Sequence, residues 1–187
     1  PDDVIAGERY DALGKEKLWY VLKASKDAKL FLGLKRQSDA GELMGALQDG
    51  SIESLLYAVS PRAGEFFHIA PGTIHGACGD VELIEVSQSS ALDFCIFAWG
   101  QALGEDEFDE SLGVIDALDF IDYSPYRNQD EISQFSVRKM DLREPVHILG
   151  ESNDSFAIYH CLYGEAVLKI TSEEPGELAY RLKGGET

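Results

Sequence analysis

Short stretches of hydrophobic residues, rather than long helical patterns, dominate the first half of this 187-residue chain. They are rich in β-prone residues, and turn residues such as Pro71-Gly72 and Gly79 separate them. The pattern predicts strands at residues 17–22, 30–34, 57–60, 65–69, 81–86 and 92–99. Short strands at such close spacing are typical of a β-sandwich or a jelly roll.

The first two predicted strands flank a polar turn at residues 24–27, which favours a hairpin-like pair. One helix is predicted after them. Ser38 is its candidate N-cap, hydrophobic residues follow at helical spacing, and Gly50 is placed to end it. A short helical turn is expected at residues 52–56. Helices are therefore a minor part of a mainly β fold.

The hydrophobic pattern also predicts how the chain divides. Residues 1–100 read as one β domain, and the acidic segment 101–134, with a weak helical pattern around Leu112, reads as a linker or capping helix. Residues 135–187 read as the start of a second, truncated β unit. Its predicted strands are 137–142, 156–162, 166–170 and 178–182. We expect both ends of the chain to be interruptions of a longer sequence.

The charge balance narrows the classes of partner. The chain has 34 acidic and 16 basic residues and a net charge of -18, a field that repels nucleic acids and anionic membrane surfaces. No apolar run approaches the roughly 20 residues of a membrane-spanning helix. The three cysteines are widely spaced and odd in number. They favour a protein of the reducing cytoplasm over one with a disulfide framework.

His75 is the most informative candidate for chemistry. It directly follows the turn Pro71-Gly72-Thr73-Ile74, where a side chain can face the mouth of a β-barrel, and a neutral imidazole is a common metal ligand. A hydrogen-bonded turn histidine is the alternative. His68, His147 and His160 lack a second ligand at a recognised spacing. Motifs for phosphate-binding loops, dinucleotide folds and serine hydrolases are absent from the sequence.

Glu82 and Glu85 lie three positions apart on one predicted strand, so their side chains face opposite sides of the sheet. They cannot act together as a simple carboxylate pair. Glu85 has hydrophobic neighbours on both sides, and we expect it to be the one that reaches the interior.

Four segments together resemble the type I mannose-6-phosphate isomerases of the cupin superfamily: residues 1–3, 14–22, 66–90 and 97–99. The resemblance implies a cupin jelly-roll barrel with short helices, followed by the start of a second jelly-roll unit. It also implies zinc-dependent interconversion of mannose 6-phosphate and fructose 6-phosphate. In such a reaction the metal stabilises the oxyanion charge that develops on the substrate. The implied partner is a small phosphosugar, and the implied cofactor is zinc.

The resemblance also implies a set of site residues. The family's zinc is held by a Gln and a His before the Pro-Asp-Asp, a Glu before the Trp-Tyr strand, and the His of the turn. His75 matches the last of these. The Glu position is occupied by Lys17, with Glu16 one residue earlier, and the Gln and His are expected upstream of Pro1. The arginine that stabilises the enediolate corresponds to Cys95, so the catalytic and substrate-binding residues remain unassigned.

Three interpretations follow. The protein is an active isomerase in which Glu16 reaches the metal through a β-bulge. Alternatively, it is a degenerate, non-catalytic cupin that binds a sugar or another small ligand, with the Lys17 ammonium in the metal's place. In the third interpretation a different metal supports a different reaction at His75. The sequence immediately upstream of Pro1 bears most directly on this choice.

Overall fold

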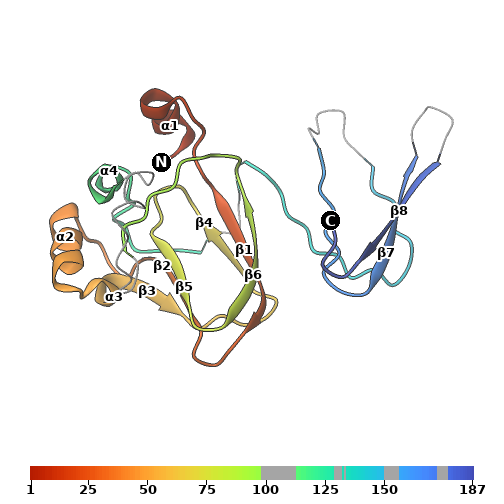
Figure 1. Ribbon diagram of the computed structural model, residues 1–187, viewed down its shortest axis with the longest axis horizontal. Helices are drawn as coiled ribbons and strands as arrows, with labels where there is room; N and C mark the ends of the chain where they lie inside the picture. Colours follow the sequence, from red (N-terminus) through yellow and green to blue (C-terminus); the bar gives the residue numbers. More distant parts are fainter. Residues whose placement is uncertain (98–112, 129–131, 133, 150–155, 172–176) are drawn as a thin grey trace, which may run out of the picture. The chain divides into compact units, whose positions relative to one another are not determined.

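The computed structural model describes residues 1–97, 113–128, 132, 134–149, 156–171 and 177–187 (Figure 1). It divides into two compact units, Pro1–Arg138 and Lys139–Thr187. The predicted boundaries after residues 100 and 134 remain predictions, and the first of them lies outside the described residues. Leu112 and the last residues of the predicted strand 92–99 also lie outside them.

The described residues of the first unit form two antiparallel sheets of three strands each. One has the order β4-β1-β6, and the other has the order β3-β2-β5 (Figure 1). The strand bounds are β1 Lys17–Ala24, β2 Lys29–Leu34, β3 Leu56–Val59, β4 Phe66–Ile69, β5 His75–Cys78 and β6 Val81–Ser87. The prediction of a mainly β fold with short helices is confirmed. Among the described strands, these sheets do not join into a closed barrel.

The expected hairpin between the first two strands is wrong. β1 is the central strand of one sheet and β2 is the central strand of the other. β2 is buried from Leu30 to Leu34, and a strand buried on both faces reads as a continuous hydrophobic run. The short polar turn joins strands of two different sheets, so the local turn signal did not reveal their partners.

The hydrophobic core explains why β2 is buried on both faces. One cluster lies between the two sheets and combines Trp19 and Val21 of β1 with Leu30 and Leu32 of β2. The other cluster packs Phe31 of β2 and its neighbours against the short helices. Alternate side chains of β2 therefore enter different parts of the core, as the two-residue period of a strand requires.

Four short helices accompany the described strands: α1 Asp3–Tyr10, α2 Ala40–Asp49, α3 Ile52–Leu55 and α4 Val114–Leu118. α2 was predicted, but its N-cap is Asp39 rather than Ser38, because the Asp39 carboxylate accepts a hydrogen bond from the Glu42 amide at 2.9 Å. Gly50 ends α2 in the left-handed region, as predicted. α1 was not predicted. None of the described helices has the length and hydropathy needed to cross a bilayer.

A glycine fixes the turn that carries the candidate histidine. Gly72 has a φ of 87°, and a Cβ atom at this position would collide with the Phe120 carbonyl oxygen. The Asp122 amide donates a hydrogen bond to the Gly72 carbonyl at 2.9 Å. The segment that follows α4 is therefore packed directly against the turn before His75.

In the second unit the described residues form one antiparallel pair, β7 Glu165–Thr171 and β8 Glu177–Lys183. Both strands were predicted. The predicted strands at residues 137–142 and 156–162 are irregular in the structure, as are the described residues of 92–99 apart from a single bridge at Phe94. A β-prone sequence forms a ladder only where a neighbouring strand supplies hydrogen-bond partners.

Candidate ligand-binding pocket

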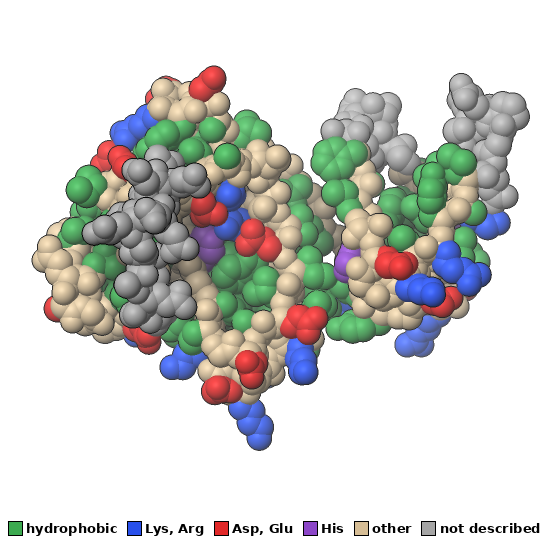
Figure 2. Space-filling view, viewed as in Figure 1, with side chains coloured by type: hydrophobic (Ala, Val, Ile, Leu, Met, Phe, Trp, Pro, Cys, Tyr) green, Lys and Arg blue, Asp and Glu red, His purple; other side chains and the backbone are tan. Residues whose placement is uncertain are grey.

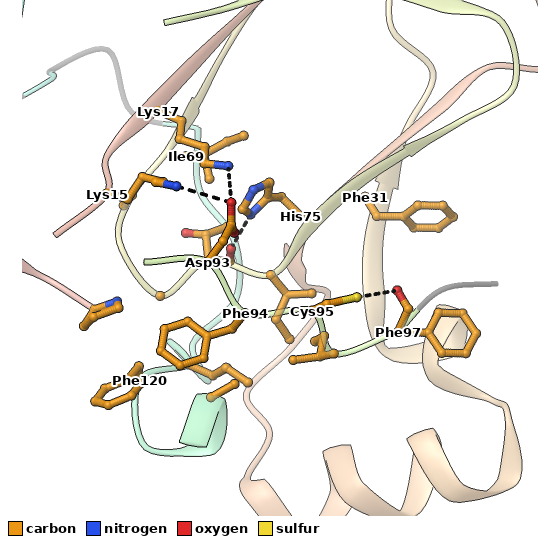
Figure 3. A pocket seen from close by; sticks show the side chains of 18 of the residues that line it. Lys15, Lys17, Phe31, Ile69, His75, Asp93, Phe94, Cys95, Phe97 and Phe120 are labelled. Carbon is orange, nitrogen blue, oxygen red and sulfur yellow. Dashed lines mark hydrogen bonds and ion pairs between the residues drawn. The ribbon is translucent and has the colours of Figure 1, made fainter. Parts of the chain in front are cut away.

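The first unit contains a pocket of about 430 Å³. This volume falls within the usual range for small-molecule sites. Its polar lining includes Lys15, Lys17, His75 and Asp93, and its apolar walls include Phe31, Ile69, Phe94, Phe97 and Phe120 (Figure 3). In the space-filling view of the first unit, basic, acidic and histidine side chains also lie together among hydrophobic ones (Figure 2). The pocket therefore combines apolar walls with a few convergent polar groups.

His75 lies at the start of β5, where the Pro71-Gly72 turn delivers it to the pocket. Its Nδ1 is 2.8 Å from the Thr73 carbonyl oxygen, so Nδ1 carries the proton and Nε2 is left as an acceptor. Burial is the main cause that lowers the pKa of His75 below its usual 6.5. The nearby Lys17 ammonium adds to this effect, while the hydrogen bond to Thr73 opposes it. His75 is therefore a neutral acceptor at pH 7.

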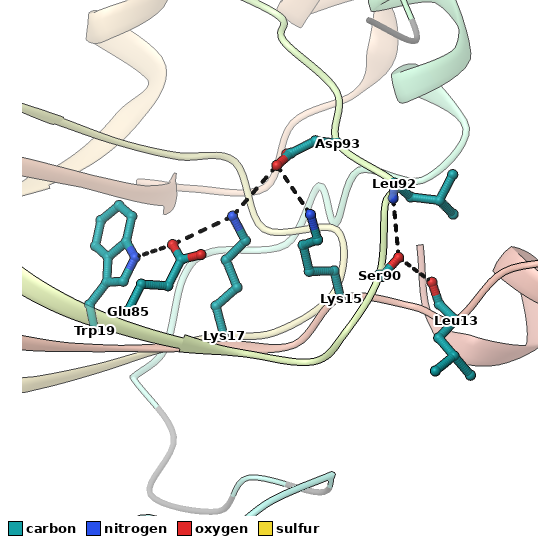
Figure 4. A network of polar contacts seen from close by, with 8 residues as sticks. All are labelled: Leu13, Lys15, Lys17, Trp19, Glu85, Ser90, Leu92 and Asp93. Carbon is teal, nitrogen blue, oxygen red and sulfur yellow. Dashed lines mark hydrogen bonds and ion pairs between the residues drawn. The ribbon is translucent and has the colours of Figure 1, made fainter. Parts of the chain in front are cut away.

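The indole of Trp19 fixes the surroundings of His75. The two rings meet edge to face, with 5.5 Å between their centroids. The indole Nε1 donates a hydrogen bond to Glu85 Oε2 at 2.7 Å (Figure 4). The register pairs Glu85 with Trp19, but its side chain is 36% exposed, so it does not reach the interior as expected. The indole hydrogen bond holds its carboxylate in one position.

Lys17, which the resemblance places at the family's Glu position, lines the pocket. Its side chain is only 9% exposed, and its Nζ lies 3.6 Å from Glu85 Oε2 and 4.0 Å from Asp93 Oδ2. Lys15, two residues earlier, faces the same way and donates a hydrogen bond to Asp93 Oδ2 at 3.3 Å (Figure 4). Two ammonium groups and two carboxylates therefore meet beside His75.

Glu16 lies on the opposite face of the same segment. Its Oε1 is 2.7 Å from His68 Nε2, and both side chains are buried. Its Oε2 accepts a hydrogen bond from the Gln134 amide at 3.1 Å. Sequence reasoning missed this partnership. The alternation of residues 15–17 predicted which side Glu16 would face, but it gave no sign that His68 would lie there.

Cys95 lines the pocket with an exposed thiol, and its Sγ is 4.0 Å from the Phe97 carbonyl oxygen. A thiol carries no permanent positive charge and cannot make the two-pronged contact of a guanidinium. His147 and His160 belong to the second unit, and His160 Nδ1 is 2.7 Å from the Thr187 hydroxyl. Neither lines this pocket.

The side chains of the pocket can be compared with the ligands that a zinc ion requires. No group of three or more His, Cys, Asp and Glu side chains suited to a metal occurs among the described residues. Among the described residues that line this pocket, His75 is the one imidazole, and the Lys17 ammonium lies at the position where a ligand carboxylate is expected. Zinc is normally held by three or four N, O or S donors, and an ammonium is not one of them. The described residues therefore do not fit a zinc ion by themselves.

Comparisons with known proteins were made for sequence and for structure. No protein-family model matches the chain. The mannose-6-phosphate isomerase of Streptococcus mutans is 31% identical over 97 residues, which cover 52% of this chain and 30% of the relative. The mannose-6-phosphate isomerase ManA of Bacillus subtilis is 26% identical over 98 residues, or 52% of this chain and 31% of the relative. The matched residues span about a third of the length of these curated relatives.

Among solved structures, the crystal structure of the mannose 6-phosphate isomerase from Bacillus subtilis has a TM-score of 0.64. The match covers all of this chain and 62% of that chain, with 19% sequence identity. At this level of identity the match concerns the fold alone. It agrees with the mainly β architecture of the two antiparallel sheets.

Proposed function

We propose that this chain, which resembles curated mannose-6-phosphate isomerases over about half of its length, binds a phosphosugar in its pocket without a family-type zinc site. The observation that carries this proposal is the position of Lys17. Its ammonium lies in the pocket, at the position where the resemblance implies a metal-ligating carboxylate, while Glu16 pairs with His68 on the opposite face.

The pocket chemistry supports a sugar ligand. Carboxylates and the His75 Nε2 can accept hydrogen bonds from sugar hydroxyls, and the two lysines can donate to ring and phosphate oxygens. Aromatic side chains such as Phe94 and Phe120 line the same pocket and offer apolar faces to the C–H groups of a sugar ring. With Lys17 as the cation, binding does not require a metal ion.

Calorimetry of the full-length protein tests this function. We expect mannose 6-phosphate to bind equally well with and without a strong zinc chelator. Lys17→Met should weaken binding at least about tenfold, because it removes a charged hydrogen-bond donor at little cost in volume. Lys23→Met is the matched control, since Lys23 lies on the same strand but is exposed. Absence of binding, or binding that the chelator abolishes, contradicts the proposal.

Cys95 provides a test of where mannose 6-phosphate binds. Its exposed thiol lines the pocket, whereas Cys161 is buried in the other unit. Alkylation of Cys95 should slow when mannose 6-phosphate is present, and mannitol at the same concentration should have no effect. If mannose 6-phosphate binds but leaves the alkylation rate unchanged, the ligand binds elsewhere.

Zinc-dependent isomerisation of mannose 6-phosphate to fructose 6-phosphate is the second candidate function. The observation that favours it is His75, which keeps the family's turn and leaves its Nε2 as an acceptor in the pocket. This candidate requires further ligands beyond the described residues. It predicts turnover of mannose 6-phosphate by the full-length protein, lost with a chelator and restored by zinc. Activity restored by another metal alone would favour a different reaction at the same centre.

A further inference from the structure

Two lysines converge on a single carboxylate oxygen at the edge of the pocket. Lys15 Nζ is 3.3 Å and Lys17 Nζ is 4.0 Å from Asp93 Oδ2 (Figures 3 and 4). The exposed fractions of the two lysine side chains are only 17% and 9%. The surrounding protein therefore holds both ammonium groups in position, whatever lies between them.

Asp93 differs from its two partners in exposure. Its side chain is 67% exposed, and it belongs to the irregular residues 92–97 rather than to a strand. An exposed carboxylate loses little when water replaces an ion-pair partner. Burial raises the pKa of Asp93, but Lys17 and Lys15 outweigh this effect and hold the pKa below its usual value. Asp93 is therefore charged at neutral pH.

Glu85, the other acidic neighbour of Lys17, is more firmly held. Its Oε2 accepts the Trp19 indole hydrogen bond at 2.7 Å as well as lying 3.6 Å from Lys17 Nζ. With both carboxylates in place, the two lysines are neutralised. If Asp93 moves away, two ammonium groups face one carboxylate, which leaves one net positive charge for an anion.

We propose that Lys15 and Lys17 form an anion subsite that the Asp93 carboxylate occupies, and that the phosphate of a ligand displaces it. Asp93 thereby acts as an internal competitor that weakens binding and selects ligands able to displace a carboxylate. The identification of the anion as a sugar phosphate rests on the proposed function. The subsite itself rests only on the geometry of the three side chains.

The test compares the protein with its Asp93→Asn variant, using inorganic phosphate, mannose 6-phosphate and mannose as probes in calorimetry at low ionic strength. The amide keeps the size of the side chain and removes its charge. We expect phosphate and mannose 6-phosphate to bind about five- to tenfold tighter to the variant than to the protein, the scale of one charge contact exposed to water. The affinity for mannose should not change. Circular dichroism verifies that the variant is folded.

Asp80→Asn is the matched control, because it makes the same change in net charge at an exposed turn outside the pocket. It should leave phosphate affinity unchanged. In the Asp93→Asn background, Lys15→Gln should remove the gain. Equal effects of Asp93→Asn and Asp80→Asn, or no phosphate binding by either variant, would overturn the subsite.

The two proposals fail in different ways. If mannose 6-phosphate binds equally to the protein and to Asp93→Asn, the subsite is wrong while the proposed function stands. Asp93→Asn could bind inorganic phosphate more tightly than the unchanged protein does, and yet bind mannose 6-phosphate no more tightly than inorganic phosphate. In that case the subsite stands while the proposed function is wrong.

Discussion

Glu16, just before β1, and His68 of β4 form a buried pair outside the pocket, with 2.7 Å between Oε1 and Nε2. The adjacent Lys17 enters the pocket. One peptide unit therefore separates a carboxylate that makes a buried contact from an ammonium that lines the pocket. The carboxylate next to Lys17 is committed to a structural contact.

Glu16→Ala should destabilise the protein by about 3 kcal/mol, because removing one member of a buried, hydrogen-bonded pair leaves the other without its partner. Urea unfolding measures the loss. Glu82→Ala on the exposed face of β6 is the control, and it should change stability by less than about 0.5 kcal/mol. Similar losses for both variants would show that the Glu16 contact adds nothing to the fold.

Lys17→Glu should raise the affinity for zinc at least about tenfold, because it replaces an ammonium with a carboxylate donor beside His75. Competition with a fluorescent zinc indicator measures the affinity. Lys17→Met removes the positive charge without supplying a ligand, so it separates loss of repulsion from gain of a donor. Equal zinc affinity in the two variants would contradict a ligand role for the carboxylate.

The same substitution bears on catalysis. If loss of the Glu and Arg positions is the whole difference from the family, Lys17→Glu combined with Cys95→Arg in the full-length protein should produce turnover of mannose 6-phosphate. A double variant that binds zinc but shows no turnover would argue against so simple an account.

Gly72→Ala should destabilise the protein by about 2 kcal/mol, since its φ of 87° disfavours a side chain and a Cβ atom would meet the Phe120 carbonyl. Thermal unfolding measures the change. Gly45→Ala is a control with the opposite expected sign. Gly45 lies in α2 with open space around it, so alanine should stabilise the helix by about 0.5–1 kcal/mol. Loss of stability at both positions would contradict this explanation.

Tyr126 should make stability depend on pH at the alkaline end. Its hydroxyl donates a hydrogen bond to the His68 carbonyl at 2.9 Å, and burial raises its pKa from 10.0 to about 12. Above pH 10 the unfolded chain releases this proton while the folded protein retains it. Its contribution is therefore complete below pH 10 and falls as pH rises toward 12.

The free energy of unfolding of the Tyr126→Phe variant should fall less steeply between pH 10 and pH 12 than that of the unchanged protein. The difference should be at most about 1 kcal/mol near pH 11, because partial exposure of the ring reduces the effect. Unfolding free energies of the two proteins at a series of pH values measure it. Parallel curves would show that other tyrosines or lysines cause the alkaline loss.

The sequence predicted the described strands of the two sheets of the first unit more accurately than their partners. β-Prone runs located β1, β2, β4 and β6 within one or two residues, but β5 was read only as a turn. The hairpin expected from the turn after β1 was wrong, because both flanking strands are central and each needs two neighbours. Pairing is decided by burial between sheets, which a local pattern does not contain.

For the candidate site too, the sequence predicted the local features but not the contacts between distant residues. The sequence by itself determined that His75 follows a tight turn and that neighbouring residues of a strand face opposite sides, and it predicted Lys17 and Cys95 at two family site positions. Only the tertiary structure decided that Asp93 lies between Lys15 and Lys17, that Glu85 is fixed by Trp19, and that Glu16 is paired with His68. These contacts join residues that are 52 to 78 positions apart in the sequence. Residues so far apart come into contact only when the sheets form and pack.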